Sequence, residues 1–179
     1  MKTERPRRRT CRLPGYDYSQ PGAYFVTIVT HGRALFLGDV DEGVLKPGAL
    51  GRIVREEWFR TADLRPEVVL LEDEVVVMPN HLHGVVRIVD PERSDGSARR
   101  VGLGTIVGNF KAASTRRARQ ILGNSRFRLW QRGFYDHVVR NGRELEDIRQ
   151  YILANPANWL SDPDNPSAEC AADFPDWMV

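Results

Sequence analysis

The pattern of apolar and polar positions along the chain predicts four β-strands. Runs that alternate with a period of two, or that are rich in β-branched residues, cover four segments: residues 23–30, 67–78, 81–89 and 127–139. The last run is interrupted near Gly133, and residues 31–47 read as an excursion from the sheet. A soluble α+β protein is the class that this mixture of strand and helix signals indicates.

Three helices are expected between and after these strands. Apolar residues at helical spacing cover residues 50–58, and a second stripe runs over residues 103–122. The third helix is expected from Asn141 to Asn155. Asn141 is a good N-cap, Glu144 stands at the reciprocal capping-box position, and Pro156 ends the helix.

The order of elements predicts a ferredoxin-like α+β fold, with an antiparallel sheet, helices on one face and one added helix. In such a sheet the third strand lies near the centre. The chain is expected to divide into a basic N-terminal arm at 1–20, one folded domain at 21–160, and an acidic, loose or surface-wrapped tail at 161–179.

Two of the four histidines, His81 and His83, stand in the third predicted strand with one apolar residue between them. Side chains at i and i+2 of a strand leave the same face, so both imidazoles point the same way. Such a pair can bind one metal ion, or it can be two polar residues on a solvated face.

Tyr151 and Asn155 are one turn apart on the third predicted helix and are therefore neighbours on its surface. A phenol and a carboxamide so placed can offer a nucleophile and an oxygen ligand to the same metal. The alternative is an amphipathic tyrosine at the edge of the core and an asparagine that caps the helix. Tyr135 is a second candidate nucleophile, but it has no Asn or Gln one turn later.

Charge is distributed unevenly, although the net charge is only +2. Residues 1–12 carry six basic side chains and one acid, residues 99–132 carry nine basic side chains and no acid, and residues 161–179 carry five acids and no base. A basic block inside a folded domain favours a polyanionic partner such as a nucleic acid. Solubility alone is the competing explanation.

No apolar run is long enough for a transmembrane helix, and the N-terminus lacks the apolar segment of a secretory signal. Cys11 and Cys170 lie near opposite ends without metal-ligand spacing, which is typical of free thiols in a reducing cytoplasm. A cytoplasmic protein is therefore expected, and a nucleic-acid partner would make it nucleoid-associated.

Five ordered stretches carry a resemblance to a known family. They are residues 14–19, 23–27, 78–84, 129–137 and 151–156. Together they resemble the REP-associated tyrosine transposases, in the single-tyrosine branch of the HUH nucleases. The His81-Leu82-His83 triplet fits the His-hydrophobe-His motif that gives HUH nucleases their name.

The resemblance implies an HUH core and a mechanism. A divalent cation, Mg²⁺ or Mn²⁺, would be held by His81, His83 and Asn155. Tyr151 would attack the scissile phosphate of single-stranded DNA, giving a 5′-phosphotyrosine and a free 3′-OH, and a second strand could reverse the step. The substrate would be hairpin-forming palindromic repeats, and both a monomer and a homodimer are compatible with the sequence.

The expected DNA contacts are basic and aromatic residues on the arm and around the second helix: Arg5, Arg7, Arg8, Arg9, Arg12, Lys111, Arg116, Arg117 and Trp130. Trp130 is equally compatible with a place in the core. Two other functions remain open: a non-catalytic, domesticated protein that binds such hairpins, and a metal-dependent RNA-processing or phosphodiesterase enzyme that would not need Tyr151.

Overall fold

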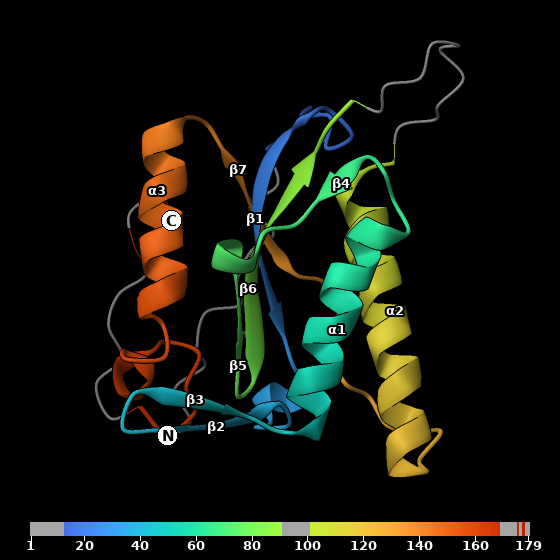
Figure 1. Cartoon of the computed structure of the whole chain (residues 1–179), viewed down its shortest axis with the longest axis vertical. Helices are drawn as coiled ribbons and strands as arrows, with labels where there is room; N and C mark the ends of the chain where they lie inside the picture. Colours follow the sequence, from blue (N-terminus) through green and yellow to red (C-terminus); the bar gives the residue numbers. More distant parts are fainter. Residues whose placement is uncertain (1–12, 91–100, 169–174, 176, 178–179) are drawn as a thin grey trace.

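A computed structural model describes residues 13–90, 101–168, 175 and 177, and Figure 1 shows the arrangement of the elements. In chain order the strands and helices are β1 (Gly22–Val29), β2 (Gly38–Asp41), β3 (Val44–Pro47), α1 (Ala49–Asp63), β4 (Val68–Val69), β5 (Val75–Met78), β6 (His81–Ile88), α2 (Leu103–Leu122), β7 (Tyr135–Val139) and α3 (Gly142–Ala154). Short 3₁₀ turns occupy His31–Arg33 (η1), Glu72–Glu74 (η2) and Trp159–Ser161 (η3). Within the described part of the chain, no helix has both the length and the apolar character needed to cross a bilayer.

The main sheet is antiparallel, with the strand order β4-β6-β1-β7 and with β5 also paired to β6. This is the order of a split β-α-β sheet, so the predicted ferredoxin-like α+β fold is confirmed. The two central strands pair along their full length, from Gly22 opposite Ile88 to Val29 opposite His81. The histidine pair therefore begins a central strand, as predicted.

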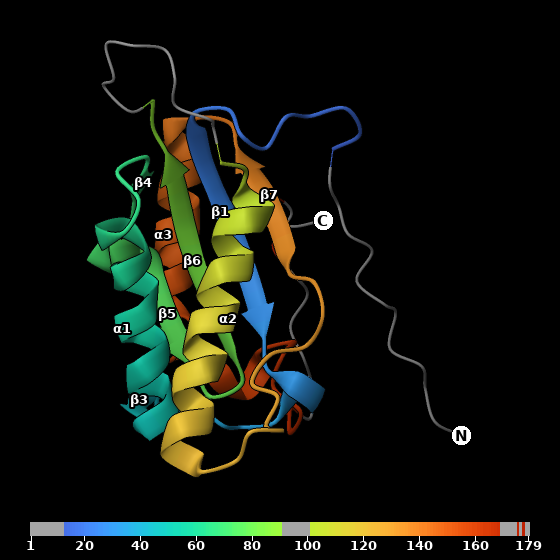
Figure 2. The same cartoon turned by 90° about the vertical axis from the view of Figure 1, so that its right-hand side faces the viewer.

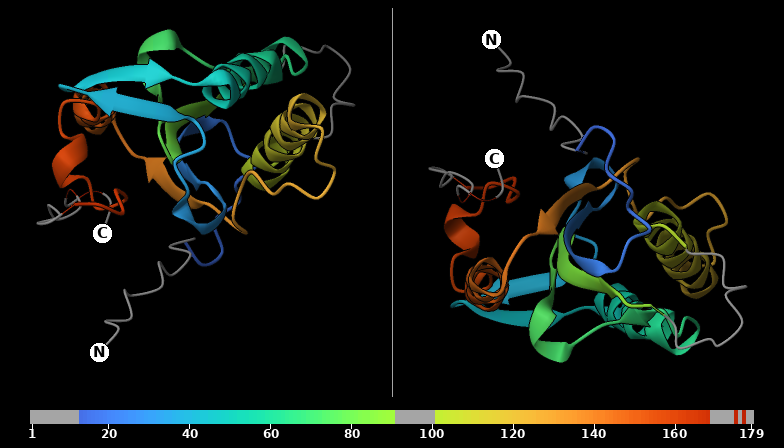
Figure 3. Two further views of the ribbon diagram at one scale, coloured as in Figure 1. Left: turned by 90° about the horizontal axis from the view of Figure 1, so that it is seen from below. Right: turned by 90° about the horizontal axis from the view of Figure 1, so that it is seen from above.

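Helices cover both faces of the sheet. Figures 2 and 3 show α1 and α2 side by side on one face and α3 on the other. Alternation along β1 supplies both interfaces: Tyr24, Val26 and Ile28 belong to the larger apolar cluster with α1 and α2, whereas Phe25 packs with Ile148 and Ile152 of α3. The second face, which the ferredoxin-like pattern alone would leave open, is thus covered by the added helix.

Gly84, directly after the histidine pair on β6, lies where Trp58 of α1 packs against the sheet. A Cβ on Gly84 would lie 2.5 Å from Cζ2 of Trp58, which is a clash. Trp58 is on α1 and only 2% exposed, so its indole fills the space above β6. The glycine lets α1 approach the strand that carries the histidines.

Three local expectations differ from the structure. The second predicted strand, residues 67–78, is interrupted by η2. The fourth, residues 127–139, is shorter in the structure: β7 begins only at Tyr135, and Trp130 forms an isolated bridge with Thr30. The excursion at 31–47 contains the β2–β3 hairpin. The predicted helix over residues 103–122 is confirmed as α2, although Ile121 and Leu122 at its end are 60% and 47% exposed and do not face the core.

The start of α3 confirms Asn141 as the N-cap, since its Oδ1 accepts the backbone N–H of Glu144 at 2.9 Å. The reciprocal half of the capping box is wrong. The carboxylate of Glu144 accepts the N–H of Arg140 at 2.6 Å and also lies 2.9 Å from Nε2 of His137. The neighbouring strand therefore takes part in fixing this end of the helix.

Candidate metal centre and nucleophile

The histidine pair lies on the face of β6 that α3 covers. Both His81 and His83 are fully buried, and their ring centroids are 4.4 Å apart. The prediction that the two imidazoles point the same way is confirmed, while the alternative of a solvated face is wrong. Two buried imidazoles side by side require polar partners, which neighbouring residues supply.

Asn80 determines which nitrogen of His81 faces the site. The amide nitrogen of Asn80 donates to the carbonyl oxygens of Asp164 at 2.8 Å and Arg33 at 3.3 Å, so Oδ1 is left as an acceptor. This Oδ1 lies 2.9 Å from Nδ1 of His81. The network assigns the proton to Nδ1 and leaves the lone pair on Nε2, the form that a metal ligand needs.

Thr27 has the corresponding role for His83. Thr27 lies on β1, the strand next to β6, and is 1% exposed. Its hydroxyl lies 2.9 Å from Nδ1 of His83. Nε2 is then the nitrogen that faces the candidate centre. Each histidine is thus oriented through Nδ1, which is the arrangement in which ligating histidines are usually held.

Asp162 is a third donor that the sequence analysis missed. The ligand atoms of His81, His83 and Asp162 all lie within 4.8 Å of one another, and Oδ2 of Asp162 is 4.0 Å from Nε2 of His81. The carboxylate is 5% exposed, and its Oδ1 accepts the N–H of Asp164 at 2.6 Å. The expected ligands His81, His83 and Asn155 are all neutral, so Asp162 would add one negative charge to the candidate set.

The segment that carries Asp162 is packed against the site. The buried carboxylate of Asp164 accepts a hydrogen bond from Nη1 of Arg33 at 2.5 Å, and Asn165 donates to the carbonyl oxygen of Trp159 at 2.8 Å. Asp162, Asp164 and Asn165 are all buried. The first residues of the acidic tail are therefore packed against the domain, which agrees with the surface-wrapped alternative rather than with a loose segment for these residues.

Asn155, the expected oxygen ligand, follows the last turn of α3 and is 3% exposed. Its Oδ1 is buried and has no hydrogen-bond partner among the residues that the structure describes. An unpartnered buried amide oxygen is costly, and binding to a cation would satisfy it. Together with two imidazole nitrogens and a carboxylate, this donor chemistry fits a divalent metal.

Tyr151 lies next to the histidine pair. Its hydroxyl is 3.4 Å from Nε2 of His83, and the two rings are 5.2 Å apart. The ring also packs against Phe25 and Trp177, at centroid distances of 6.2 and 5.5 Å. The competing Tyr135 is 9% exposed at the start of β7 and packs on Phe25 at 6.4 Å. The structure thus brings Tyr151 to a candidate metal ligand.

Three of the expected DNA contacts are engaged within the protein, namely Lys111, Arg117 and Trp130. Lys111 donates to the carbonyl oxygens of Gln131 at 2.8 Å and Gly133 at 2.6 Å, and burial lowers its pKa to about 8. Arg117 pairs with Glu56 at 2.6 Å and Glu57 at 3.0 Å on α1. These contacts tie elements of the protein together, and a DNA contact by either side chain stays a prediction.

Trp130 is 8% exposed, and its indole N–H donates to Oγ of Ser114 at 2.9 Å. Its ring packs on Phe110, so the core alternative describes its position. Arg116 is exposed on α2. The arm residues Arg5, Arg7, Arg8, Arg9 and Arg12 lie outside the described residues.

Other exposed arginines of the same acid-free block were not singled out from the sequence. Arg126, Arg128 and Arg132 are exposed on the segment between α2 and β7, and none of them forms an ion pair with an acid in the part of the chain that the structure describes. Because Trp130 of this segment bridges to Thr30, next to η1, the segment runs past the end of the sheet where β6 begins.

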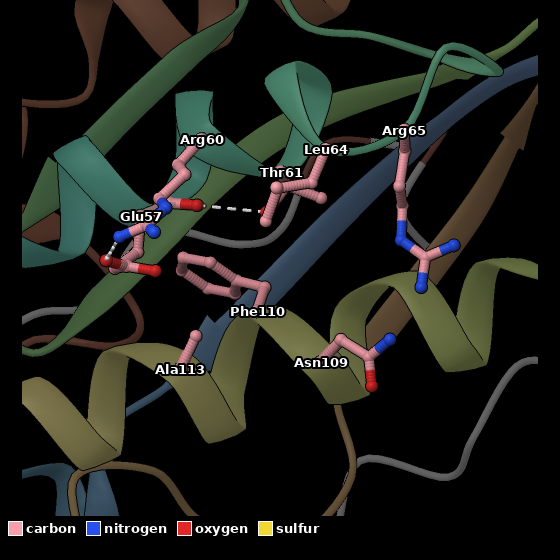
Figure 4. A pocket seen from close by; sticks show the side chains of 8 residues that line it. All are labelled: Glu57, Arg60, Thr61, Leu64, Arg65, Asn109, Phe110 and Ala113. Carbon is pink, nitrogen blue, oxygen red and sulfur yellow. Dashed lines mark hydrogen bonds and ion pairs between the residues drawn. The ribbon is translucent and has the colours of Figure 1, made fainter.

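A groove of 280 Å³ between α1 and α2 is separate from the metal centre (Figure 4). Arg60 and Arg65 line it, but they pair with Glu57 at 3.6 Å and Glu67 at 3.2 Å. The groove lies on the opposite face of the sheet from His81 and His83, so it has no part in the site formed with α3.

Comparison with known proteins gives three relevant findings, although no protein-family model matches the chain. An uncharacterized protein of Haemophilus influenzae is 31% identical over 170 residues, covering 87% of this chain and 91% of that protein. A second protein of the same organism, provisionally named a REP-associated tyrosine transposase, is 26% identical over 146 residues, which is 78% of this chain and 73% of that protein. The solved structure of a REP-associated tyrosine transposase bound to a REP hairpin matches with a TM-score of 0.55 at 19% identity, over 82% of this chain and 73% of that one. This last likeness shows the shared fold.

Proposed function

Because the chain belongs to the family of REP-associated tyrosine transposases, we propose that it nicks and rejoins single-stranded DNA at hairpin-forming repeats, with Tyr151 as the nucleophile. The observation that carries the proposal is the position of the Tyr151 hydroxyl, 3.4 Å from Nε2 of His83. It places a phenol beside the group of buried donors formed by His81, His83 and Asp162.

His81, His83 and Asp162 would hold a divalent cation, and the unpartnered Oδ1 of Asn155 is a fourth candidate donor. A bound Mg²⁺ or Mn²⁺ would supply Lewis acidity toward the scissile phosphate and would stabilise the negative charge that develops there. The carboxylate of Asp162 adds the hard, anionic ligand that such ions prefer. Phosphate oxygens and water would complete the coordination.

The protein's own part in the step is that of a positioned nucleophile. A free phenol has a pKa of about 10, so at neutral pH its oxygen needs activation in the site. The phenolic oxygen of Tyr151 loses its proton and bonds to phosphorus, while the bond from phosphorus to the 3′ oxygen breaks. That oxygen takes up a proton, leaving a free 3′-OH and a 5′-phosphotyrosine. Attack by a second 3′-OH reverses the exchange and joins DNA without ATP.

Backbone phosphates of the hairpin are the proposed partners of the exposed arginines around the end of α2. Arg116, Arg126, Arg128 and Arg132 are exposed and form no ion pair with an acid in the described part of the chain, so their positive charge is available to phosphates. The basic arm at residues 1–12 remains a proposed second contact. A protein with such a substrate acts beside the nucleoid in the cytoplasm.

Covalent capture of DNA tests this function. A 5′-labelled and a 3′-labelled oligonucleotide that contain a palindrome from the DNA flanking the gene are incubated with protein in Mn²⁺, in Mg²⁺ or in EDTA. We expect a protein–DNA adduct on a denaturing gel in at least one of the two metal ions, Mn²⁺ or Mg²⁺, and none in EDTA. If the protein binds the hairpin but forms no adduct with either metal, it is a non-catalytic binding protein. If it cleaves the DNA without forming an adduct, it is a phosphodiesterase that does not use a tyrosine nucleophile. Either result overturns the proposal.

A further inference from the structure

Polar contacts attach α3 to the rest of the protein on both sides of its apolar stripe. On one side, Arg149 donates to the carboxylate of Glu74 through Nε at 3.0 Å and pairs with it through Nη2 at 2.9 Å. Glu74 is fully buried at the end of η2, and it also accepts Nε of Arg87 on β6 at 2.9 Å. One buried carboxylate thus joins a strand of the sheet to the middle of the helix.

The second contact lies on the opposite side of the stripe. Glu144, in the first turn of α3, is 2.9 Å from Nε2 of His137 on β7 and accepts the N–H of Arg140 at 2.6 Å. Burial by itself would raise the pKa of Glu144, but these hydrogen bonds outweigh it and lower that pKa. The carboxylate is therefore charged at neutral pH, and it binds the helix to the last strand of the sheet.

Helical geometry relates both contacts to the nucleophile. At about 100° per residue, Glu144 and Tyr151 are two turns apart and lie on the same side of the helix. Arg149 lies about 200° from Tyr151 around the axis. Ile148 and Ile152, which are buried against the sheet, stand between the two sides. An apolar stripe alone tolerates some rotation of the helix, whereas two directional contacts on opposite sides oppose rotation in both senses.

We propose that the Arg149–Glu74 and Glu144–His137 pairs are positioning contacts, which set the rotation of α3 so that the hydroxyl of Tyr151 meets Nε2 of His83. This proposal rests on the proposed function of Tyr151. None of the four side chains is among the candidate donors at His81, His83, Asp162 and Asn155. Their effect on the reaction therefore passes through the helix that carries the nucleophile.

The variants Arg149→Met and Arg149→Lys test the proposal, with Arg143→Met as the matched control. Arg143 is exposed on the same helix and forms no ion pair within the part of the chain that the structure describes. Loss of the contact is expected to slow adduct formation in a single turnover by about 10- to 100-fold, because a small displacement of a reacting group costs rates of that order. Hairpin affinity and Mn²⁺ affinity are expected to stay within about twofold, and Arg149→Lys should recover part of the rate.

A second measurement reports the position of Tyr151 without any cleavage. The five tyrosines are replaced by 3-fluorotyrosine, and the ¹⁹F resonance of Tyr151 is assigned by its loss in Tyr151→Phe. Added Mn²⁺ is expected to broaden this resonance strongly in the parent protein and in Arg143→Met, and clearly less in Arg149→Met. If the parent forms no adduct, the proposed function fails, but this comparison still decides whether Arg149 positions the tyrosine.

Thermal melting of each variant comes first. If Arg149→Met does not fold, the comparison of Arg149→Lys with the parent carries the test. The positioning role is overturned if both Arg149 variants fold and keep the parental rate of adduct formation and the parental broadening. It is also overturned if rate and metal affinity fall together, because that result would describe damage to the metal centre.

Discussion

Nδ1 of His81 lies 2.9 Å from Oδ1 of Asn80, and this contact between adjacent residues prepares the candidate metal centre. Both amide hydrogens of Asn80 are directed to carbonyl oxygens, those of Asp164 and Arg33. These bonds identify the atom that faces His81 as the amide oxygen, which accepts hydrogen bonds and cannot donate them. The imidazole must therefore donate from Nδ1. One buried asparagine thus orients a candidate metal ligand and also binds the chain segment that carries Asp162.

Replacing Asn80 with Ala is expected to weaken Mn²⁺ binding by about 10- to 100-fold, the range found when a residue that orients a ligand is removed. Stability should fall by about 1–3 kcal/mol, because the buried carbonyl oxygen of Asp164 and the partly buried one of Arg33 lose their donor. Titration calorimetry with Mn²⁺ and thermal melting measure the two effects. Asn109→Ala, at an exposed position on α2, is the control. Unchanged metal affinity in Asn80→Ala would contradict the assigned role.

Asp162→Asn tests the donor that only the structure reveals. The change keeps the shape of the side chain but removes its charge, so Mn²⁺ affinity is expected to fall at least about tenfold. In the parent protein, metal at about 100 times its dissociation constant should add about 2.7 kcal/mol of stability. His81→Ala and His83→Ala should abolish that gain. A melting shift with Mn²⁺ that is the same in the parent and in Asp162→Asn would show that this carboxylate is not a ligand.

The salt dependence of DNA binding should distinguish the exposed arginines between α2 and β7, which are proposed phosphate contacts, from Arg117, which pairs with acids of α1. Log affinity for a single strand falls with log salt by about 0.7 per neutralised phosphate. The triple variant with alanine at Arg126, Arg128 and Arg132 is therefore expected to flatten the slope by about 1–2 and to melt like the parent. Arg117→Ala should instead lower the melting temperature, because it leaves the buried Glu57 with a weaker partner. The opposite pattern would place the DNA surface elsewhere.

The fold was predictable because its signals are local. The alternation around His81 and His83 placed both imidazoles on one face, and the order of elements placed their strand at the centre of the sheet. Asn141 was identified as a cap from sequence because an N-cap contacts a backbone group only three residues away. Each of these inferences depends on residues that are near one another in the chain.

The missing parts of the site depend on contacts between distant residues. Asp162 stands in an acidic, proline-rich segment with no periodic pattern, and only the folding of that segment onto Asn80 and Arg33 brings it to the histidines. Arg117 looked free because its partners Glu56 and Glu57 are some 60 residues away on another helix. A charge pattern read along the chain does not show such pairings.

Mapping the residue that becomes bonded to DNA tests the central claim most directly. The adduct formed on a hairpin oligonucleotide is digested with nuclease and protease, and mass spectrometry locates the modified tyrosine. We expect the phosphate on Tyr151, no adduct from Tyr151→Phe despite nearly unchanged hairpin binding, and adduct from Tyr135→Phe. An adduct that persists in Tyr151→Phe and disappears in Tyr135→Phe would contradict the account.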